Sequence, residues 1–111
     1  MLENLFGNPV IEKVLFYLLK NEKAYASQLS QVFETPLYSF QKALERLEKG
    51  GIIVREAQGK TQLYFFNPRY PMLKEIKLFL EKSYEFLPED FREKYYEAPL
   101  RKRPRRKGKP L

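Results

Sequence analysis

The chain contains no cysteine and no histidine. It therefore forms no disulfide, zinc finger or iron–sulfur centre, and it has no Ser–His or Cys–His pair for nucleophilic catalysis. Asp90 is the single aspartate, so a carboxylate metal site would need glutamates, and their spacing suggests none. Tyr, Lys and Glu remain as acid–base groups and form no recognisable constellation. We expect neither an enzyme nor a bound cofactor.

Long hydrophobic runs are also missing. The longest, residues 14–19, is far shorter than the roughly 20 residues that a membrane helix needs. The N-terminus lacks the basic region of a secretory signal peptide. We expect a cytoplasmic protein that does not associate with membranes.

The length of 111 residues fits one small domain, because two domains would each bury too little surface. Aromatic residues are abundant at 15%, from nine Phe and eight Tyr. This composition predicts a real hydrophobic core.

Positive charge is concentrated at the C-terminal end of the chain. The last eleven residues contain seven cations and no acid, namely Arg101, Lys102, Arg103, Arg105, Arg106, Lys107 and Lys109. The whole chain has 21 basic and 14 acidic residues, so without these seven the first hundred residues are formally neutral. Three prolines and a glycine interrupt the run, which predicts a disordered arm over residues 99–111.

Nucleic-acid phosphates are the natural partner of such an arm, either along the backbone or in a minor groove. A solubility tail, or attraction to acidic lipid or ribosomal RNA, remains an alternative.

Apolar periodicity predicts three helices in the first half of the chain. Asn8 is placed to cap a helix that starts at Pro9 and runs to about residue 20. A shorter helix fits residues 24–32. The third spans residues 35–49, with Thr35 as its cap and Gly50-Gly51 at its end.

The second half begins with a β-hairpin. Residues 52–57 and 61–66 are rich in β-branched and aromatic side chains, and residues 58–60 form a short loop that contains glycine. A further helix follows over residues 70–87. Residues 88–98 fit a short helical extension, so the predicted organisation is a domain at 1–87, this extension, and the arm at 99–111.

This order of elements predicts a mainly α protein with a β-hairpin wing, a winged helix-turn-helix. The chain resembles the ArsR-like branch of bacterial and archaeal winged-helix transcriptional regulators. The resemblance rests on LFGNP (residues 5–9), ALERLEKGGII (43–53) and GKTQLYFFNP (59–68), and it covers residues 5–87.

The resemblance implies that helix 35–49 enters the major groove of double-stranded DNA. Tyr38, Ser39, Gln41 and Lys42 would then face base edges, and Arg46 would contact phosphate. The wing over residues 55–61 would touch the backbone or minor groove through Arg55, Lys60 and Thr61, with Gln58 beside them. Two alternatives stay open: Tyr38 packs over the helix-turn-helix junction, and Gln41 and Lys42 form only a solvated face.

The resemblance also implies a homodimer through the last long helix. One apolar stripe of that helix consists of Leu73, Ile76, Leu80 and Tyr84, while Leu78 and Phe79 lie on a second side. One face would pack on the domain and the other on a partner, and the stripe of Leu73, Ile76, Leu80 and Tyr84 is the expected dimer interface. The alternative is that the monomer buries all six side chains. Metal-sensing members of the ArsR family bind metal through Cys or His, so the sequence does not support a metal sensor.

The sequence thus favours a homodimeric transcriptional regulator that binds specific double-stranded DNA. Glu34, Glu45 and Glu48 in or beside the third helix favour a second reading, a winged-helix adaptor that binds another protein. A third is an RNA-associated protein that is bound through its basic arm.

Overall fold

The computed structural model describes residues 1–97, so the arm predicted at 99–111 lies outside the described residues. The elements follow the predicted helix and strand order, with an additional short helix near the N-terminus and one extra strand. They are α1 (Glu3–Phe6), α2 (Pro9–Asn21), β1 (Lys23–Tyr25), α3 (Ala26–Phe33), α4 (Leu37–Lys49), β2 (Ile53–Gln58), β3 (Thr61–Phe66), α5 (Leu73–Tyr84), α6 (Glu89–Arg92) and the π-helical turn η1 (Glu93–Glu97).

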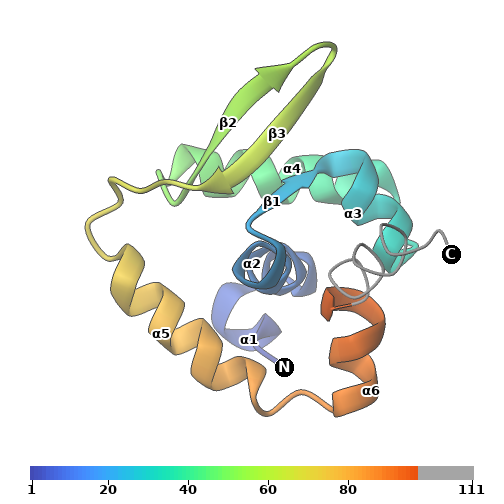
Figure 1. Cartoon of the computed structure of the whole chain (residues 1–111), viewed down its shortest axis with the longest axis vertical. Coiled ribbons are helices and arrows are strands. Elements are labelled where there is room, and N and C mark those ends of the chain that lie inside the picture. The colour runs from blue at the N-terminus through green and yellow to red at the C-terminus, as the bar shows by residue number, and fades with distance from the viewer. Residues whose placement is uncertain (98–111) are drawn as a thin grey trace, which may run out of the picture.

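Helix α2 runs through the centre of the molecule, where Figure 1 shows it end-on. The predicted cap is confirmed, because the Asn8 side chain accepts a hydrogen bond from the Val10 amide at 2.6 Å and Pro9 is the first helical residue. Five consecutive residues of α2, Val14 to Leu18, are buried. A surface helix would bury only one stripe, so this burial reflects neighbours on several sides.

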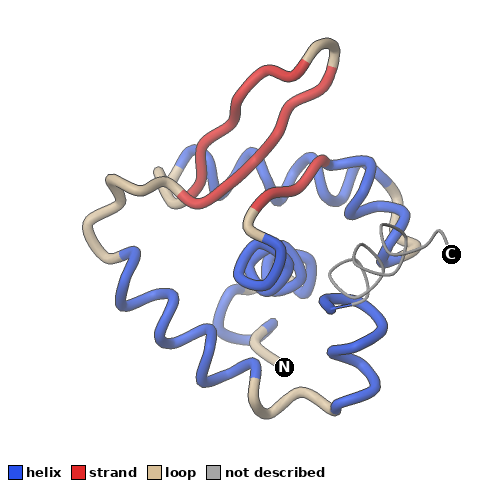
Figure 2. The backbone as a smooth tube through the Cα atoms, in the orientation of Figure 1, coloured by secondary structure: helices blue, strands red, loops and turns tan. Residues whose placement is uncertain are grey.

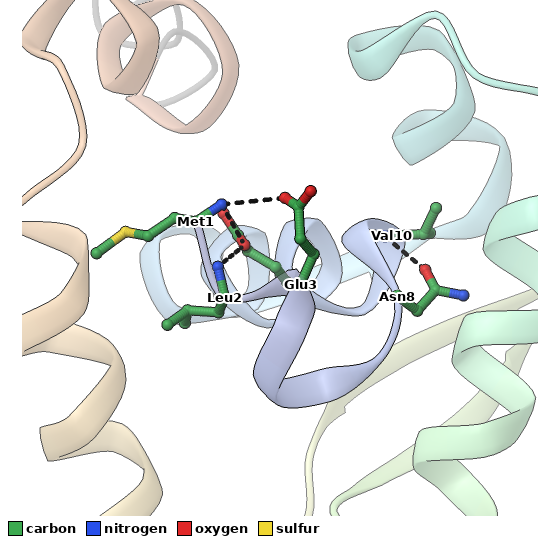
Figure 3. Close-up of polar contacts among 6 residues, drawn as sticks. Met1, Leu2, Glu3, Asn8 and Val10 are labelled. Atoms are coloured by element: carbon green, nitrogen blue, oxygen red, sulfur yellow. Dashed lines mark hydrogen bonds and ion pairs between the residues drawn. The ribbon is translucent and has the colours of Figure 1, made fainter.

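The N-terminal segment is tied to the start of α2. The buried carboxylate of Glu12 accepts a hydrogen bond from the Leu2 amide and pairs with the Met1 ammonium at 3.2 Å. Figure 3 shows the polar contacts of Met1 and Leu2 near the Asn8 cap. They hold α1 against α2.

Helices α3 and α4 form the helix-turn-helix pair, and the turn between them differs in detail from the prediction. Helix α4 begins at Leu37 with Pro36 as its N-cap, so Thr35 is not the cap. The Thr35 hydroxyl instead donates to the Phe33 carbonyl at 3.0 Å. Glu34 adopts a left-handed conformation with φ of 50° to make the turn.

The sheet is antiparallel with the order β1-β3-β2. The β-hairpin wing is confirmed: β2 and β3 project from the helices in Figure 2, and Gly59 takes a positive φ of 62° in the turn. The strand β1 was not predicted. Residues 23–25 pair with residues 63–65 of β3, so α3 starts two residues later than the sequence pattern suggested.

Helix α5 is shorter at both ends than the predicted 70–87, and the chain then turns back through α6 and η1. Tyr96 in η1 is fully buried, with its ring centroid 5.8 Å from Phe16, 5.5 Å from Phe33 and 5.7 Å from Tyr84. Burial raises the pKa of the Tyr96 and Tyr84 hydroxyls above the ordinary tyrosine value. The predicted division between a domain at 1–87 and an extension at 88–98 therefore matches no boundary in the packing, because Tyr96 completes the core.

Each helix within residues 1–97 is too short or too polar to span a bilayer.

Candidate nucleic-acid interface

Helix α4 separates sharply into an inner and an outer face. Phe40, Ala43, Leu44 and Leu47 are buried against the core. The outer face carries exposed polar side chains, namely Tyr38, Gln41, Lys42, Glu45, Arg46 and Lys49. Lys49 was missed as a candidate, although its spacing of seven residues from Lys42 puts it on the same helical face.

Tyr38 points to solvent and is 67% exposed. The ammonium of Lys42, one turn later, lies 5.8 Å from the centroid of its ring. Tyr38 is therefore not packed over the helix-turn-helix junction, and the pair forms a cation–π contact on the open face of α4. Gln41 is exposed beside this pair, and Ser39 is half-buried.

The wing joins the interface at the C-terminal end of α4. The Arg55 guanidinium on β2 pairs with the Glu48 carboxylate at 3.1 Å, so Arg55 is held against α4. The Thr61 hydroxyl donates to the Gln58 carbonyl at 2.8 Å and is thus engaged in the wing turn. Lys60 is exposed at the tip.

The charge of this surface is nearly balanced. Its cations are Lys42, Arg46, Lys49, Arg55 and Lys60. Its carboxylates are Glu34, Glu45, Glu48 and Glu56. Long-range attraction for a polyanion must therefore come from elsewhere in the chain. The predicted contacts Arg101, Lys102, Arg103, Arg105, Arg106 and Lys107 lie outside the described residues.

The predicted dimer stripe on α5 requires a correction. Leu80 and Tyr84 are buried in the core of the same chain, and Leu73 and Ile76 pack partly against it. The second side of α5 faces solvent instead, with Leu78 56% and Phe79 43% exposed. The sequence pattern identified two apolar sides, but packing on α2 uses the side that was assigned to the partner.

An apolar pocket of about 380 Å³ lies between α1, α2, the end of α4 and α5. Leu5, Ile76 and Phe79 are among its lining residues, together with Arg46 from the outer face of α4. Leu5 was not predicted to be part of an interface, but its side chain is apolar and the residue is 66% exposed. Exposed apolar side chains thus gather on α1 and α5.

Within residues 1–97, no three acidic side chains are arranged to hold a metal ion.

The fold has a counterpart among solved structures. The chain is similar to ZitR of Lactococcus lactis, solved as a mutant in the apo form, with a TM-score of 0.54 and 16% sequence identity over 93% of this chain and 86% of that chain. The chain has a winged-helix fold. No family model matches the sequence, and no curated protein matches it.

Proposed function

We propose that this winged-helix protein binds specific sequences in double-stranded DNA and regulates transcription without catalysing a reaction. The carrying observation is the outer face of α4, where Tyr38, Gln41 and Lys42 stand free of the core, on a helix whose C-terminal end is joined to the wing by the Arg55–Glu48 ion pair. A helix of this size fits the major groove of B-DNA. A structural likeness to ZitR supports the fold on which this proposal depends.

The exposed side chains suit base and phosphate contacts. Gln41 has the donor and acceptor pair that recognises adenine, and the Lys42 ammonium matches the acceptors of guanine. Arg46 and Lys49 lie further along α4 and are suited to phosphates, as is Lys60 at the wing tip.

Selection from a random duplex DNA library tests the proposal. The full chain and a version that ends at Leu100 are used at near-physiological salt. We expect both to recover one shared palindromic motif, because base recognition resides in α4. A library without enrichment for either protein contradicts the proposal.

The variants Gln41→Ala and Lys42→Ala are expected to relax the base preference at one position each. A bidentate base contact contributes about 1–3 kcal/mol of discrimination, so that position of the motif would lose most of its selectivity. Lys82→Ala on α5 is the matched control, because its ammonium is exposed on a helix away from α4. Repeating the selection measures the effect. An unchanged motif for both α4 variants would show that neither the Gln41 nor the Lys42 side chain recognises a base.

The variant Glu48→Gln is expected to tighten binding to all duplexes. It removes a carboxylate from the interface and releases Arg55 from its 3.1 Å ion pair. One added phosphate contact raises affinity about fivefold at 0.15 M salt and steepens the salt dependence by about 0.9. Fluorescence anisotropy at several salt concentrations measures both, with Glu85→Gln in the exposed Lys82 pair on α5 as the control. Equal gains from the two variants would point to net charge alone.

We also propose that the protein acts as a homodimer, with half-sites about 34 Å apart. The exposed apolar side chains of Leu78 and Phe79 on α5, and of Leu5 on α1, support this assembly. Phe79 and Leu5 both line the apolar pocket between α1 and α5.

The variant Leu78→Glu is expected to yield a monomer of unchanged stability. The side chain is exposed within one chain, so a charge there disturbs only a partner. Leu80→Ala serves as the contrast, because it should leave assembly intact but lower the free energy of unfolding by about 2–5 kcal/mol. Sedimentation velocity over a range of concentrations distinguishes them. A Leu78→Glu protein that sediments like the original would rule out this surface.

The four carboxylates around α4 and the wing favour a second candidate, an adaptor that binds another protein through the same face. Salt-dependent and sequence-selective duplex binding would eliminate it. Binding that depends on the arm and shows no motif would favour RNA or nonspecific nucleic acid.

A further inference from the structure

We propose that the apolar pocket between α1, α2, the end of α4 and α5 binds a small monocarboxylate with an apolar body, and that this ligand opposes DNA binding. The ligand site depends only on the shape and charge of the pocket. Its effect on DNA rests on the proposed function.

The pocket has a buried apolar floor and an exposed apolar rim. Ile11, Leu15 and Leu80 line it and are each at most 3% exposed. Leu5 and Phe79 also line it and are 66% and 43% exposed. An apolar body in this pocket would remove both its own surface and these side chains from water, which is the main source of affinity in small-molecule sites.

The volume of the pocket, about 380 Å³, limits the size of the ligand. A cavity of roughly 150 Å³ lined by Leu, Ile and Phe accommodates benzene, so this pocket has room for about twice as many carbon atoms. It lies near the lower end of the range of roughly 300–1,000 Å³ that is usual for small-molecule sites. The ligand is therefore small, with a body the size of a medium-length alkyl chain.

The charge of the ligand follows from Arg46. It is the single charged residue among those that line the pocket. Within residues 1–97 its guanidinium has no carboxylate partner, whereas Arg55 pairs with Glu48. The planar guanidinium matches a carboxylate with two parallel hydrogen bonds, which favours an anionic head over a neutral one.

A second, polar pocket of about 410 Å³ adjoins the first, since Ile11 and Arg46 line both. It is also lined by Lys42 and Lys49, and Glu45 offsets one of its three cations. The junction at Arg46 thus has an apolar hollow on one side and excess positive charge on the other. This arrangement suits a ligand with an apolar body and one anionic end.

The position of Arg46 links the ligand to DNA. Arg46 is exposed on the outer face of α4, where it is suited to contact a phosphate. A carboxylate bound to the guanidinium neutralises this cation and repels the DNA backbone. The coupling is reciprocal, so DNA would weaken binding of the ligand by the same factor.

Isothermal titration calorimetry with octanoate and 1-octanol tests the site in the full chain. The two probes share an apolar body and differ in charge. We expect one octanoate per chain, bound about fivefold more tightly than octanol because of the partly exposed ion pair. Arg46→Gln should remove this preference. Arg69→Gln should keep it, because Arg69 is exposed and lines neither pocket. Absence of octanoate binding, or equal binding of both probes to the original protein, would overturn the inference.

Ile76→Phe tests the location of the apolar body. Ile76 lines the pocket and is half-buried, so a larger side chain occupies part of the space. We expect about tenfold weaker binding of both probes, because the ligand would be overpacked. Urea unfolding checks that this variant is folded. Undiminished octanoate binding by the folded variant would place the ligand elsewhere and contradict the proposal.

A second copy of the chain is the competing occupant of the pocket. Leu78→Glu distinguishes the two, because Leu78 is exposed and is not among the lining residues. Octanoate should bind this variant and the original alike. Binding by Leu78→Glu alone would mean that a second copy fills the pocket of the original, and would overturn the proposal.

Fluorescence anisotropy on a selected duplex tests the effect on DNA. Saturating octanoate should weaken binding about fivefold at 0.15 M salt, which corresponds to one lost phosphate contact. Octanol should have no effect, because it leaves the charge of Arg46 unchanged. Equal weakening by both probes, or by neither, would overturn the coupling.

The two proposals fail in different ways. A library that yields no motif contradicts the proposed function, and calorimetry still tests the ligand site. Specific duplex binding together with absent octanoate binding contradicts only the ligand site.

Discussion

Removal of residues 101–111 is expected to weaken binding to every duplex by on the order of 100-fold at near-physiological salt. The deleted segment holds seven of the 21 cations, and the remainder of the chain is formally neutral. The surface of α4 and the wing also mixes cations with carboxylates, so it provides little attraction at a distance. Because the lost contacts are to phosphates, specific and nonspecific duplexes should be affected alike.

The salt dependence of the affinity is the sharper measurement. Each phosphate contact contributes about 0.9 to the slope of log affinity against log salt, so loss of seven cations can flatten the slope by as much as about 6. A full-length chain with residues 101–111 in scrambled order keeps the charge and should bind like the original. If the truncated protein keeps the affinity and slope of the full chain, the arm does not contact DNA.

The variant Tyr96→Ala is expected to lower the free energy of unfolding by about 3–5 kcal/mol. Tyr96 is fully buried, and its ring contacts Phe16, Phe33 and Tyr84 from three elements. Truncation would leave a cavity that this aromatic cluster cannot fill without shifting. Since domains of this size unfold with about 5–15 kcal/mol, the variant would be close to unfolding.

Tyr96→Phe provides the control for this prediction. The Tyr96 hydroxyl is buried and has no hydrogen-bond partner among the described residues, so its removal should stabilise the protein by about 1 kcal/mol. Urea unfolding followed by circular dichroism measures both variants. An unaltered midpoint for Tyr96→Ala would mean that η1 does not pack in the core in solution.

Local signals in the sequence were sufficient to predict those elements whose conformation depends only on residues close by in the chain. The Asn8-Pro9 start of α2, the positive φ of Gly51 after α4, and the hairpin around Gly59 each follow from the preferences of one or two residues. The apolar repeat of α4 likewise fixed which of its faces is buried, and this left Gln41 and Lys42 on the outside. These features made the winged-helix order predictable.

Contacts between distant segments were not predictable in this way. Strand β1 has three residues and exists because β3, some 40 residues later, offers it hydrogen bonds. The ion pair between Arg55 and Glu48 depends on how the wing leaves α4. Thr35 was expected to be a cap because of its type, but the geometry of the turn gave that position to Pro36.

The sequence by itself determined the local starts and ends of the central helices, the hairpin, and the separation of a neutral domain from a basic arm, since these depend on residue type and short spacing. Only the tertiary structure decided which apolar side of α5 faces inward, because the sequence places apolar side chains on two sides of this helix and packing on α2 covers one of them. It also decided that Tyr95 and Tyr96 close the core beside Phe33, a contact across more than 60 residues that no local pattern encodes.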